Sequence, residues 1–418
     1  MVDSTALHEI VVDLGPTSRS GPKPVGRLSR ERGTMRFEYE QSWLDSTDSL
    51  VLDPMIGTYP GPQFPAPDRD NFGLFEDVSP DRWGCVLMQR REDLSAYELG
   101  RKPRSLTAWD YLLGVQDETR MGALRHRAPR TKVYLDSNPK PVPPVTELRS
   151  LEAASRELET ALERGDLDAL DRWIRVLIEP GSSLGGARPK CSFRMVDGSL
   201  WIAKFPAKDD QRNVGLWEQV LARLAGNAGI STAQSRLYEF GQRFHTFITR
   251  RFDRHGSTRI PFASAMNFTE KTDGTEASYL DIVQALDDHG TYEVKQDLEQ
   301  LFRRVVFNIL VSNRDDHLRN HGFFVTRDGI RLAPAYDLNP MPEKATHALS
   351  IDDTSTAPDL SLALATAELY GLDKSTANRL VARVRDAIAP WRDIARDLGA
   401  NRAELLFMEA AFSGRGDY

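Results

Sequence analysis

The segment that decides the fold reads Ser312-Asn313-Arg314-Asp315-Asp316-His317-Leu318-Arg319-Asn320. Two strand-like runs follow it, Phe323 to Thr326 and Ile330 to Ala333, and Asp328-Gly329 between them is typical of a two-residue hairpin turn. A hairpin centred on that turn would pair Asn320 with Asp337 at its open end. We therefore expect two oxygen-bearing side chains to face each other there, where one magnesium ion could bridge them.

The spacing inside this segment indicates phosphoryl transfer. In the catalytic loop of kinases an aspartate orients the nucleophile, and an asparagine five residues later binds magnesium. Asp315 and Asn320 have this spacing. His317 lies between them and could either act as a general base or pack and hydrogen-bond the loop. The predicted catalytic residues are thus Asp315 and His317, and the predicted metal ligands are Asn320 and Asp337.

A candidate phosphate-binding loop precedes this segment. The stretch from Ser182 to Lys190 is rich in small residues, which let backbone N–H groups approach phosphate oxygens closely, and its two cations add positive charge. A Gly-Gly loop alone is more often an ordinary turn, so this prediction depends on the other motifs. The residues expected to contact ATP here are Ser183, Gly185, Gly186, Ala187, Arg188 and Lys190.

A lysine and a glutamate complete the predicted nucleotide site. Cys191 to Val196 and Ser199 to Phe205 are predicted to be two strands joined by a two-residue turn at Asp197-Gly198. Lys204 lies on an otherwise apolar face of the second strand, either as an edge residue that reaches solvent or as an ammonium aimed at a phosphate. Glu218 in the following helical stretch could pair with Lys204 and orient it.

The pattern along the chain predicts an α+β fold of two lobes that resembles protein kinases, with a β-rich N-terminal part and a mainly helical C-terminal lobe. Proline-rich residues 138–144 are the best linker candidate. We expect a β-rich subdomain over residues 1–135, a nucleotide-binding lobe over 146–260, and a helical lobe with the catalytic and metal-binding segment over 261–418.

Bulk composition excludes several other classes. The 418 residues are 40% hydrophobic and 28% charged, as in globular proteins, and a net charge of −7 argues against a nucleic-acid binder with a uniformly basic surface. The two cysteines, Cys85 and Cys191, support neither a disulfide framework nor a zinc site. The absence of a long apolar run and of a leader-like N-terminus predicts a cytoplasmic protein without membrane spans.

In combination, the motifs resemble those of the HipA-like serine/threonine kinases, toxins of bacterial toxin–antitoxin pairs. The resemblance is firm over residues 180–350 and looser elsewhere. Three positions depart from the family pattern: Arg319, the pair Arg188-Pro189, and Arg250. The departures at Arg188-Pro189 and at Arg250 affect the expected contacts with the nucleotide. The matching runs are Ser183 to Lys190, Ile202 to Pro206, Arg251 to Arg254, Asp315 to Asn320 and Ala333 to Asp337.

The resemblance implies further roles. ATP and Mg²⁺ would be the cofactors, Lys204 would contact the ATP phosphates, and Arg251 and Phe252 would line the adenine side of the cleft. Ser183 matches a serine whose phosphorylation switches such kinases off, although Ser182 beside it is an alternative. The implied partners are a small helix-turn-helix antitoxin that makes most of the DNA contact and a protein substrate, such as an aminoacyl-tRNA synthetase.

Two other functions stay open at this stage. The run Asp-x-His-x-x-Asn also resembles the loop of lipid kinases, so a small-molecule or lipid kinase is one alternative. A non-catalytic, ATP-binding pseudokinase that acts through protein or operator contacts is the other.

Overall fold

The computed structural model describes residues 7–17, 21–135, 142–164, 169, 188–241 and 243–412. Internal contacts divide the chain into two compact units. Unit 1 comprises Met1–Asp209 and Arg250–Ala263, and unit 2 comprises Asp210–Thr249 and Ser264–Tyr418. These bounds differ from the three predicted segments, because the chain leaves unit 1 after residue 209 and returns to it for 250–263. The predicted division by role remains a proposal.

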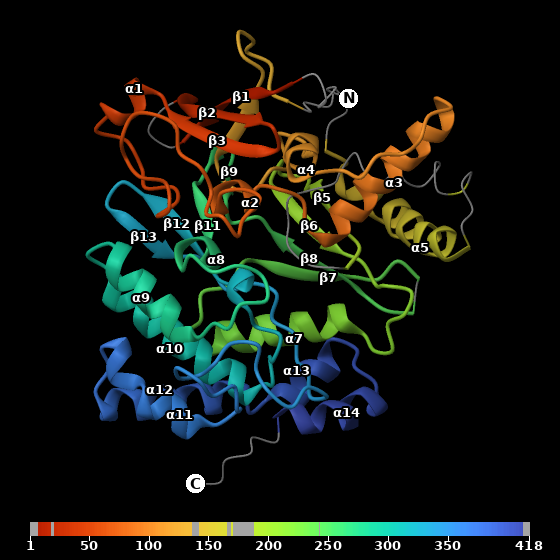
Figure 1. Ribbon diagram of the computed structural model, residues 1–418. Helices are drawn as coiled ribbons and strands as arrows, with labels where there is room; N and C mark the ends of the chain where they lie inside the picture. The colour runs from red at the N-terminus through yellow and green to blue at the C-terminus, as the bar shows by residue number, and fades with distance from the viewer. Residues whose placement is uncertain are drawn as a thin grey trace. The chain divides into compact units, whose positions relative to one another are not determined.

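Unit 1 begins with a four-stranded antiparallel sheet in the order β3-β2-β1-β4 (Figure 1). A two-residue turn joins β2 to β3, and both turn residues, Arg32 and Gly33, have positive φ, as hairpin turns that match the strand twist require. Phe37 of β3 packs against Phe75, with ring centroids 5.6 Å apart. The strands are β1 (Glu9–Leu14), β2 (Lys23–Glu31), β3 (Thr34–Tyr39) and β4 (Leu124–Arg127).

Four helices lie between β3 and β4 in unit 1, within the part of the chain that was predicted to be β-rich. Asp81 caps helix α3 (Arg82–Glu98) by accepting a hydrogen bond of 2.6 Å from the Gly84 N–H. A later helix buries its apolar stripe, which includes Leu148, Leu151 and Leu158. The helical elements are α1 (Gln41–Leu44), α2 (Gly73–Glu76), α3 (Arg82–Glu98), α4 (Ala108–Gly114), the 3-10 turn η1 (Val145–Glu147) and α5 (Leu148–Arg164).

The predicted hairpin around Asp197-Gly198 forms, but its turn differs. β5 (Lys190–Arg194) pairs with β6 (Leu200–Lys204) in a register that sets Arg194 opposite Leu200. The Met195 N–H donates to the Ser199 carbonyl, and the Gly198 N–H donates to the Met195 carbonyl. The loop therefore has three residues, 196–198, rather than the two expected. Gly198 has φ +81°, as in three-residue hairpin loops in which a type I turn is followed by a glycine bulge.

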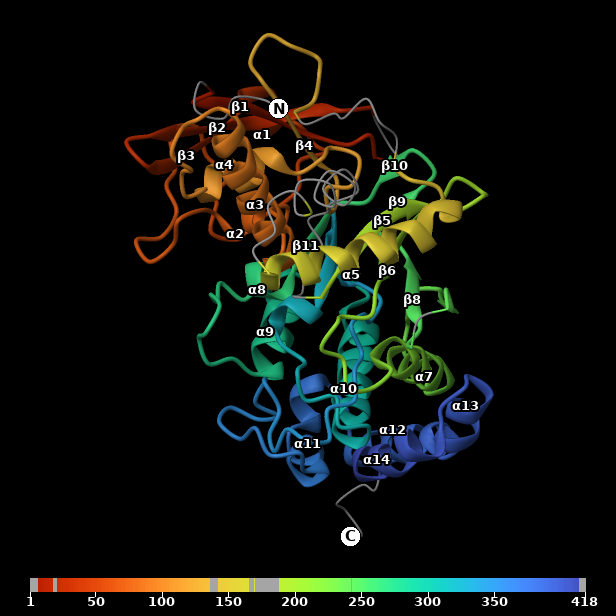
Figure 2. The same cartoon turned by 90° about the vertical axis from the view of Figure 1, so that its right-hand side faces the viewer.

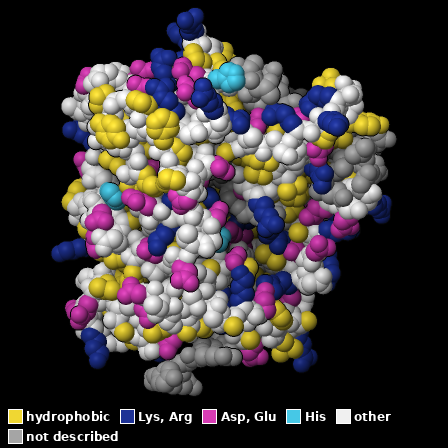
Figure 3. All heavy atoms as spheres, in the orientation of Figure 1, with side chains coloured by type: hydrophobic (Ala, Val, Ile, Leu, Met, Phe, Trp, Pro, Cys, Tyr) yellow, Lys and Arg dark blue, Asp and Glu magenta, His cyan; other side chains and the backbone are white. Residues whose placement is uncertain are grey.

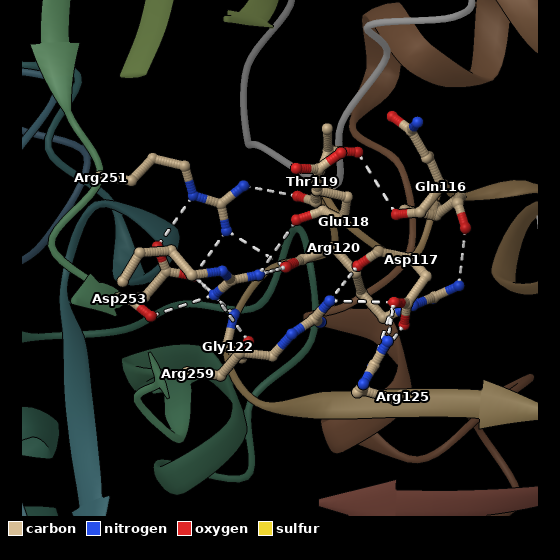
Figure 4. Close-up of polar contacts among 12 residues, drawn as sticks. Gln116, Asp117, Glu118, Thr119, Arg120, Gly122, Arg125, Arg251, Asp253 and Arg259 are labelled. Carbon is tan, nitrogen blue, oxygen red and sulfur yellow. Dashed lines mark hydrogen bonds and ion pairs between the residues drawn. The ribbon is translucent and has the colours of Figure 1, made fainter. Parts of the chain in front are cut away.

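The returning segment of unit 1 is fastened to residues 117–125 by arginines (Figure 4). The Arg251 guanidinium donates to both oxygens of Asp253, at 2.8 and 2.5 Å, and to the Thr119 carbonyl at 2.5 Å. The Gly122 N–H donates to Asp253 at 2.8 Å, and Asp117 accepts from Arg259 at 3.0 Å. This segment carries β9 (Arg254–His255), β10 (Thr258–Arg259) and the start of β11 (Phe262–Ser264).

Unit 2 is mainly helical, with two antiparallel hairpins. Its strands are β7 (Ser235–Tyr238) and β8 (Thr246–Arg250), which pair, and β12 (Gly322–Thr326) and β13 (Gly329–Leu332), which also pair. Its helices are α7 (Val214–Asn227), α8 (Ala265–Phe268), α9 (Tyr279–His289), α10 (Val294–Leu310), α11 (Leu360–Ala365), α12 (Lys374–Ile388), α13 (Trp391–Asp397) and α14 (Arg402–Phe412). Two 3-10 turns, η2 (Leu318–Asn320) and η3 (Ala367–Tyr370), complete the unit.

Apolar stripes along the helices form the core of unit 2. Leu301 and Phe302 of α10 are buried, as are Leu380 and Val384 of α12. Figure 1 shows α10 lying between α9 and α12, with which it is in contact. Figure 2 shows α13 beside α7, its partner in packing. Asn213 caps α7 by accepting from the Leu216 N–H at 3.2 Å.

The fold class is α+β, with sheets toward the N-terminus and helices toward the C-terminus, as predicted. No helix within the described residues has both the length and the apolar character needed to cross a membrane. On the face drawn in Figure 3, Lys and Arg side chains are interspersed with Asp and Glu side chains.

Candidate active site

A buried carboxylate fixes the predicted catalytic loop in unit 2. Asp316, with its side chain 2% exposed, accepts hydrogen bonds from three separate elements. The Tyr279 hydroxyl of α9 lies at 2.6 Å and the Asn308 amide of α10 at 2.8 Å. His321 Nε2, just after η2, lies 2.6 Å from the same oxygen. The backbone at residue 316 is therefore held from three directions, which also fixes its neighbour Asp315.

The charge state of Asp316 follows from these partners. Burial would raise the pKa of its carboxyl, but the charge of His321 and the hydrogen bonds from His321 and Tyr279 hold the pKa below its ordinary value. Burial, and then the charge of Asp316, raise the pKa of the Tyr279 phenol. Asp316 is thus an ionised carboxylate with a structural role. Nothing in the sequence around residue 316 predicted that role.

Asp315, the predicted catalytic aspartate, has a different environment. Its side chain is 46% exposed, and its Oδ1 forms an ion pair with Lys344 Nζ. His317 is exposed to solvent. The side chains of adjacent loop residues therefore lie in different environments. Asp316 faces the core, whereas Asp315 and His317 face solvent, where a substrate hydroxyl could reach them.

A second segment, residues 336–348, lies along the catalytic loop. The Asn339 N–H donates to Asn313 Oδ1 at 3.2 Å, and the Met341 N–H donates to the Ser312 carbonyl at 2.8 Å. The Tyr336 hydroxyl donates to the Arg319 carbonyl at 2.7 Å, so this segment is bonded to both ends of the loop. The segment that carries Asp337 is thereby held against the segment that carries Asp315 and Asn320.

The predicted pairing of Asn320 with Asp337 through the hairpin register is wrong. β12 and β13 pair Thr326 with Gly329, so the turn residues are 327 and 328 rather than 328 and 329. The glycine is needed for close packing instead: at φ +125°, a Cβ on Gly329 would lie 2.4 Å from the His289 carbonyl oxygen. The two segments meet through the side-chain and backbone contacts described above, and Asn320 itself lies in η2.

The two predicted metal ligands have oriented side chains. Asn320 is buried, and its amide nitrogen donates to the Asp315 carbonyl at 3.2 Å, which leaves an oxygen as its ligand atom. The Asn339 amide donates to Asp337 Oδ1 at 3.1 Å. Asp337 holds the left-handed conformation, with φ +58°, which is uncommon outside glycine and tends to occur at functional sites.

These donors suit magnesium. One carboxylate and one amide oxygen are hard ligands, and Mg²⁺ in phosphotransferases is commonly held by one or two carboxylates together with substrate phosphates. Within the described residues, no cluster of three or more His, Cys, Asp or Glu side chains forms an all-protein metal site. The donor set therefore fits an ion that arrives with a nucleotide.

The predicted ATP contacts lie in both units. Lys190 is buried in unit 1, where its Nζ lies 2.7 Å from Asp81 Oδ2. Lys204, the last residue of β6, is half-buried. In unit 2, Glu218 on α7 is 4% exposed rather than solvent-facing. Arg188 is half-buried. Ser183, Gly185, Gly186 and Ala187, together with Ser182, lie outside the described residues.

The structure gives the Arg251 side chain partners other than a nucleotide, although the sequence predicted that it lines the adenine side of the cleft. The Arg251 side chain is 1% exposed, and its guanidinium is occupied by Asp253 and by backbone carbonyls of residues 119 and 120. Asp253 stays ionised: burial would raise its pKa, but the charges of Arg251 and Arg254 lower it. The guanidinium is thus a structural group in this arrangement. Phe252 is half-buried and packs on Phe262, with ring centroids 5.7 Å apart, and its place beside adenine remains a prediction.

The geometry described so far is that of a loop with the residue types expected of a kinase catalytic loop, held against the segment that carries Asp337. The model of the HipA-like C-terminal domain family matches residues 182–391, which is half of the chain, so the chain belongs to this family. The family resemblance inferred from the sequence is thereby confirmed.

Known proteins resemble the chain at low sequence identity. It is 25% identical over 226 residues to the serine/threonine-protein kinase toxin HipA of Shewanella oneidensis, a match that covers 47% of this chain and 50% of that protein. It is 24% identical over 341 residues to the putative kinase Y4mE of Sinorhizobium fredii, covering 75% of this chain and 74% of that one. The chain thus spans about half the length of HipA, the first of these relatives.

A solved structure shows the same fold over nearly the whole chain. HipA of Shewanella oneidensis MR-1, determined in a complex with HipB and operator DNA, aligns with a TM-score of 0.65 and covers 97% of this chain and 95% of that one. The sequence identity is 16%, so this likeness concerns the fold.

Proposed function

We propose that the chain is an ATP- and magnesium-dependent serine/threonine-protein kinase. The observation that carries the proposal is the anchoring of Asp315, Asn320 and Asp337 in two adjacent segments of unit 2 over the buried Asp316 network. Membership of the HipA-like family supports the same chemistry.

The proposed roles follow from the environment of each residue. Asp315 accepts the proton of the substrate hydroxyl, because its carboxylate is accessible while the neighbouring Asp316 is enclosed. Asn320 and Asp337 would hold Mg²⁺, which neutralises phosphate charge when bound. Lys204 is proposed to contact the ATP phosphates and Glu218 to orient it. The solvent-facing His317 is a second candidate for proton transfer.

The direct test is transfer of γ-phosphate from labelled Mg-ATP to the protein itself or to lysate proteins, resolved by gel and by intact mass. Asp315→Asn should abolish transfer, whereas Asp393→Asn, which alters an exposed ion pair on α13, should leave it intact. An Asp315→Asn protein that labels at the wild-type rate would falsify the catalytic assignment.

We propose further that the kinase is the toxin of a toxin–antitoxin pair. A structural relative was determined in a complex with HipB and operator DNA, which supports a protein partner for this chain. From the family resemblance, we propose that this partner is a small helix-turn-helix antitoxin that makes most of the DNA contact. The growth-inhibiting target would be a component of translation, such as an aminoacyl-tRNA synthetase. Induction should slow growth, co-expression of a neighbouring helix-turn-helix protein should restore it, and Asp315→Asn should be harmless when induced.

Autophosphorylation is a proposed means of control. Ser183, or Ser182 beside it, is the candidate acceptor, and a phosphoserine would place about two negative charges where ATP phosphates must bind. Peptide mapping after incubation with Mg-ATP should locate the phosphate at one of these serines, and Ser183→Ala should prolong activity if Ser183 is the acceptor.

The alternative substrates give different outcomes in the same experiment. Label in a small-molecule or lipid fraction, with none in protein, would indicate a small-molecule or lipid kinase. A rise in melting temperature with ATP and no phosphate transfer would indicate a pseudokinase.

A further inference from the structure

Lys344 is the cation closest to the proposed catalytic carboxylate among the contacts described in unit 2. Its Nζ forms an ion pair with Asp315 Oδ1, and the two side chains are 44% and 46% exposed. Exposed pairs of this kind contribute only about 0–1 kcal/mol to stability, so the ammonium can leave Asp315 at little cost. The pair is therefore poorly explained as a structural bond.

The backbone of Lys344 is fixed much more firmly than its side chain. The Lys344 N–H donates to the Met341 carbonyl at 3.2 Å, and the Met341 N–H donates to the Ser312 carbonyl at 2.8 Å. The Arg314 guanidinium donates to the Lys344 carbonyl. This turn is thus hydrogen-bonded directly to Ser312 and Arg314, two of the three residues that precede Asp315.

A second contact lies on the other side of the turn. Glu343, next to Lys344, forms an ion pair of 2.8 Å with Arg212, the residue before the N-cap of α7. Burial would raise the pKa of Glu343, but the hydrogen bond from Arg212 holds the pKa below its usual value. A hydrogen-bonded turn therefore presents the Lys344 ammonium to the one exposed carboxylate of the catalytic loop.

We propose that Lys344 is a catalytic residue of phosphoryl transfer, whose ammonium contacts the transferring phosphoryl group beside Asp315. This role rests on the proposed kinase function. The hydroxyl oxygen of the substrate forms a bond to the γ-phosphorus of ATP, and the bond from that phosphorus to the bridging oxygen breaks. ADP leaves with the electron pair, and the hydroxyl proton passes to the Asp315 carboxylate. Lys344 keeps its proton and stabilises negative charge on the phosphoryl oxygens.

The test compares three variants of the full chain at saturating peptide or lysate substrate. Lys344→Met should lower kcat by about 10²–10³-fold, the loss typical when one preorganised donor to a transition state is removed, while KM for ATP stays near wild type. Lys344→Arg, which keeps the charge, should recover part of kcat. Lys374→Met, which removes an exposed lysine at the start of α12, should match wild type.

Each outcome decides between explanations. A Lys344→Met protein that melts like the wild type and transfers phosphate at the wild-type kcat overturns the role of Lys344 but leaves the kinase proposal standing. A higher kcat also overturns it, because the ion pair would then be an inhibitory contact. No transfer by the wild type, with ATP bound, would instead remove the proposed function on which the role depends.

Discussion

Lys190 Nζ and Asp81 Oδ2 lie 2.7 Å apart inside unit 1, with side chains only 4% and 3% exposed. Lys190 starts β5, and Asp81 caps α3. Burial raises the pKa of the Asp81 carboxyl, although the charge of Lys190 opposes the shift. The ion pair thus ties the strand that follows the predicted phosphate loop to the N-terminus of a helix.

Removing one partner of this pair should be costly. Asp81→Ala leaves a buried ammonium without its counter-charge and α3 without its cap, so the free energy of unfolding should fall by about 3–5 kcal/mol. Asp393→Ala, which breaks an exposed pair on α13, should change it by less than about 1 kcal/mol. Denaturant unfolding followed by circular dichroism measures both, and equal losses would show that the pair is not desolvated as described.

The Asp316 network makes a separate prediction about the catalytic loop. Asp316→Ala leaves three buried donors without their acceptor and should lower the free energy of unfolding by about 3–5 kcal/mol, with loss of phosphate transfer. Tyr279→Phe removes a single donor and should cost about 1–2 kcal/mol. Thermal melts and transfer assays on both proteins would check this order. A normal transfer rate in Asp316→Ala would mean that the network does not position Asp315.

His347 predicts an acid sensitivity of unit 2. Burial lowers its pKa from 6.5 to about 4 in the folded protein. Above pH 6.5 the ring is neutral in both states and adds no pH dependence. As the pH falls from 6.5 toward 4, the unfolded chain binds a proton that the folded chain does not, so stability is lost, by up to about 3 kcal/mol.

The check is to measure urea unfolding at pH 7 and pH 5 for the wild type and for His347→Gln, whose side chain does not titrate. The wild type should lose more stability than the variant between these two values. The same loss in both proteins would assign the acid sensitivity to other groups, for example Asp316 or the carboxyls of the surface.

Asn339 offers a test of the metal assignment that leaves both proposed ligands in place. Its amide donates to Asp337 Oδ1 and orients that carboxylate. Loss of such an outer partner typically weakens metal binding by about 10–100-fold, so Asn339→Ala should raise the Mg²⁺ concentration that gives the half-maximal rate by about that factor. Saturating Mg²⁺ should restore most of kcat. An unchanged Mg²⁺ titration would argue that Asp337 is not a ligand.

Local patterns in the sequence predicted much of the fold. The apolar periods of α5, α10 and α12 and the alternation in β3 report which face is buried, and that information is contained in a few consecutive residues. Helix α3 was missed because its buried positions are few among many charges. The run Ser79-Pro80-Asp81 before it was an available start signal.

The positions of the candidate site residues could not be read from local sequence patterns. Asp328-Gly329 looks like a turn, yet Gly329 is required by the carbonyl of His289, forty residues away, and no local rule contains that contact. The same holds for Asp316, whose three donors come from α9, α10 and residue 321, and for Lys344, which sequence reasoning did not single out. Polar partners from distant segments decide these positions.

The chain enters unit 1 twice, before residue 209 and again at 250–263, and the arginines of the second passage bind residues 117–122 of the first. A truncated gene that stops at residue 209 would lack those arginines. One that starts at residue 210 would include residues 250–263, which belong to unit 1. Neither unit is one continuous stretch of the chain, so a gene for unit 1 alone has to join residue 209 to residue 250 through a linker that replaces residues 210–249.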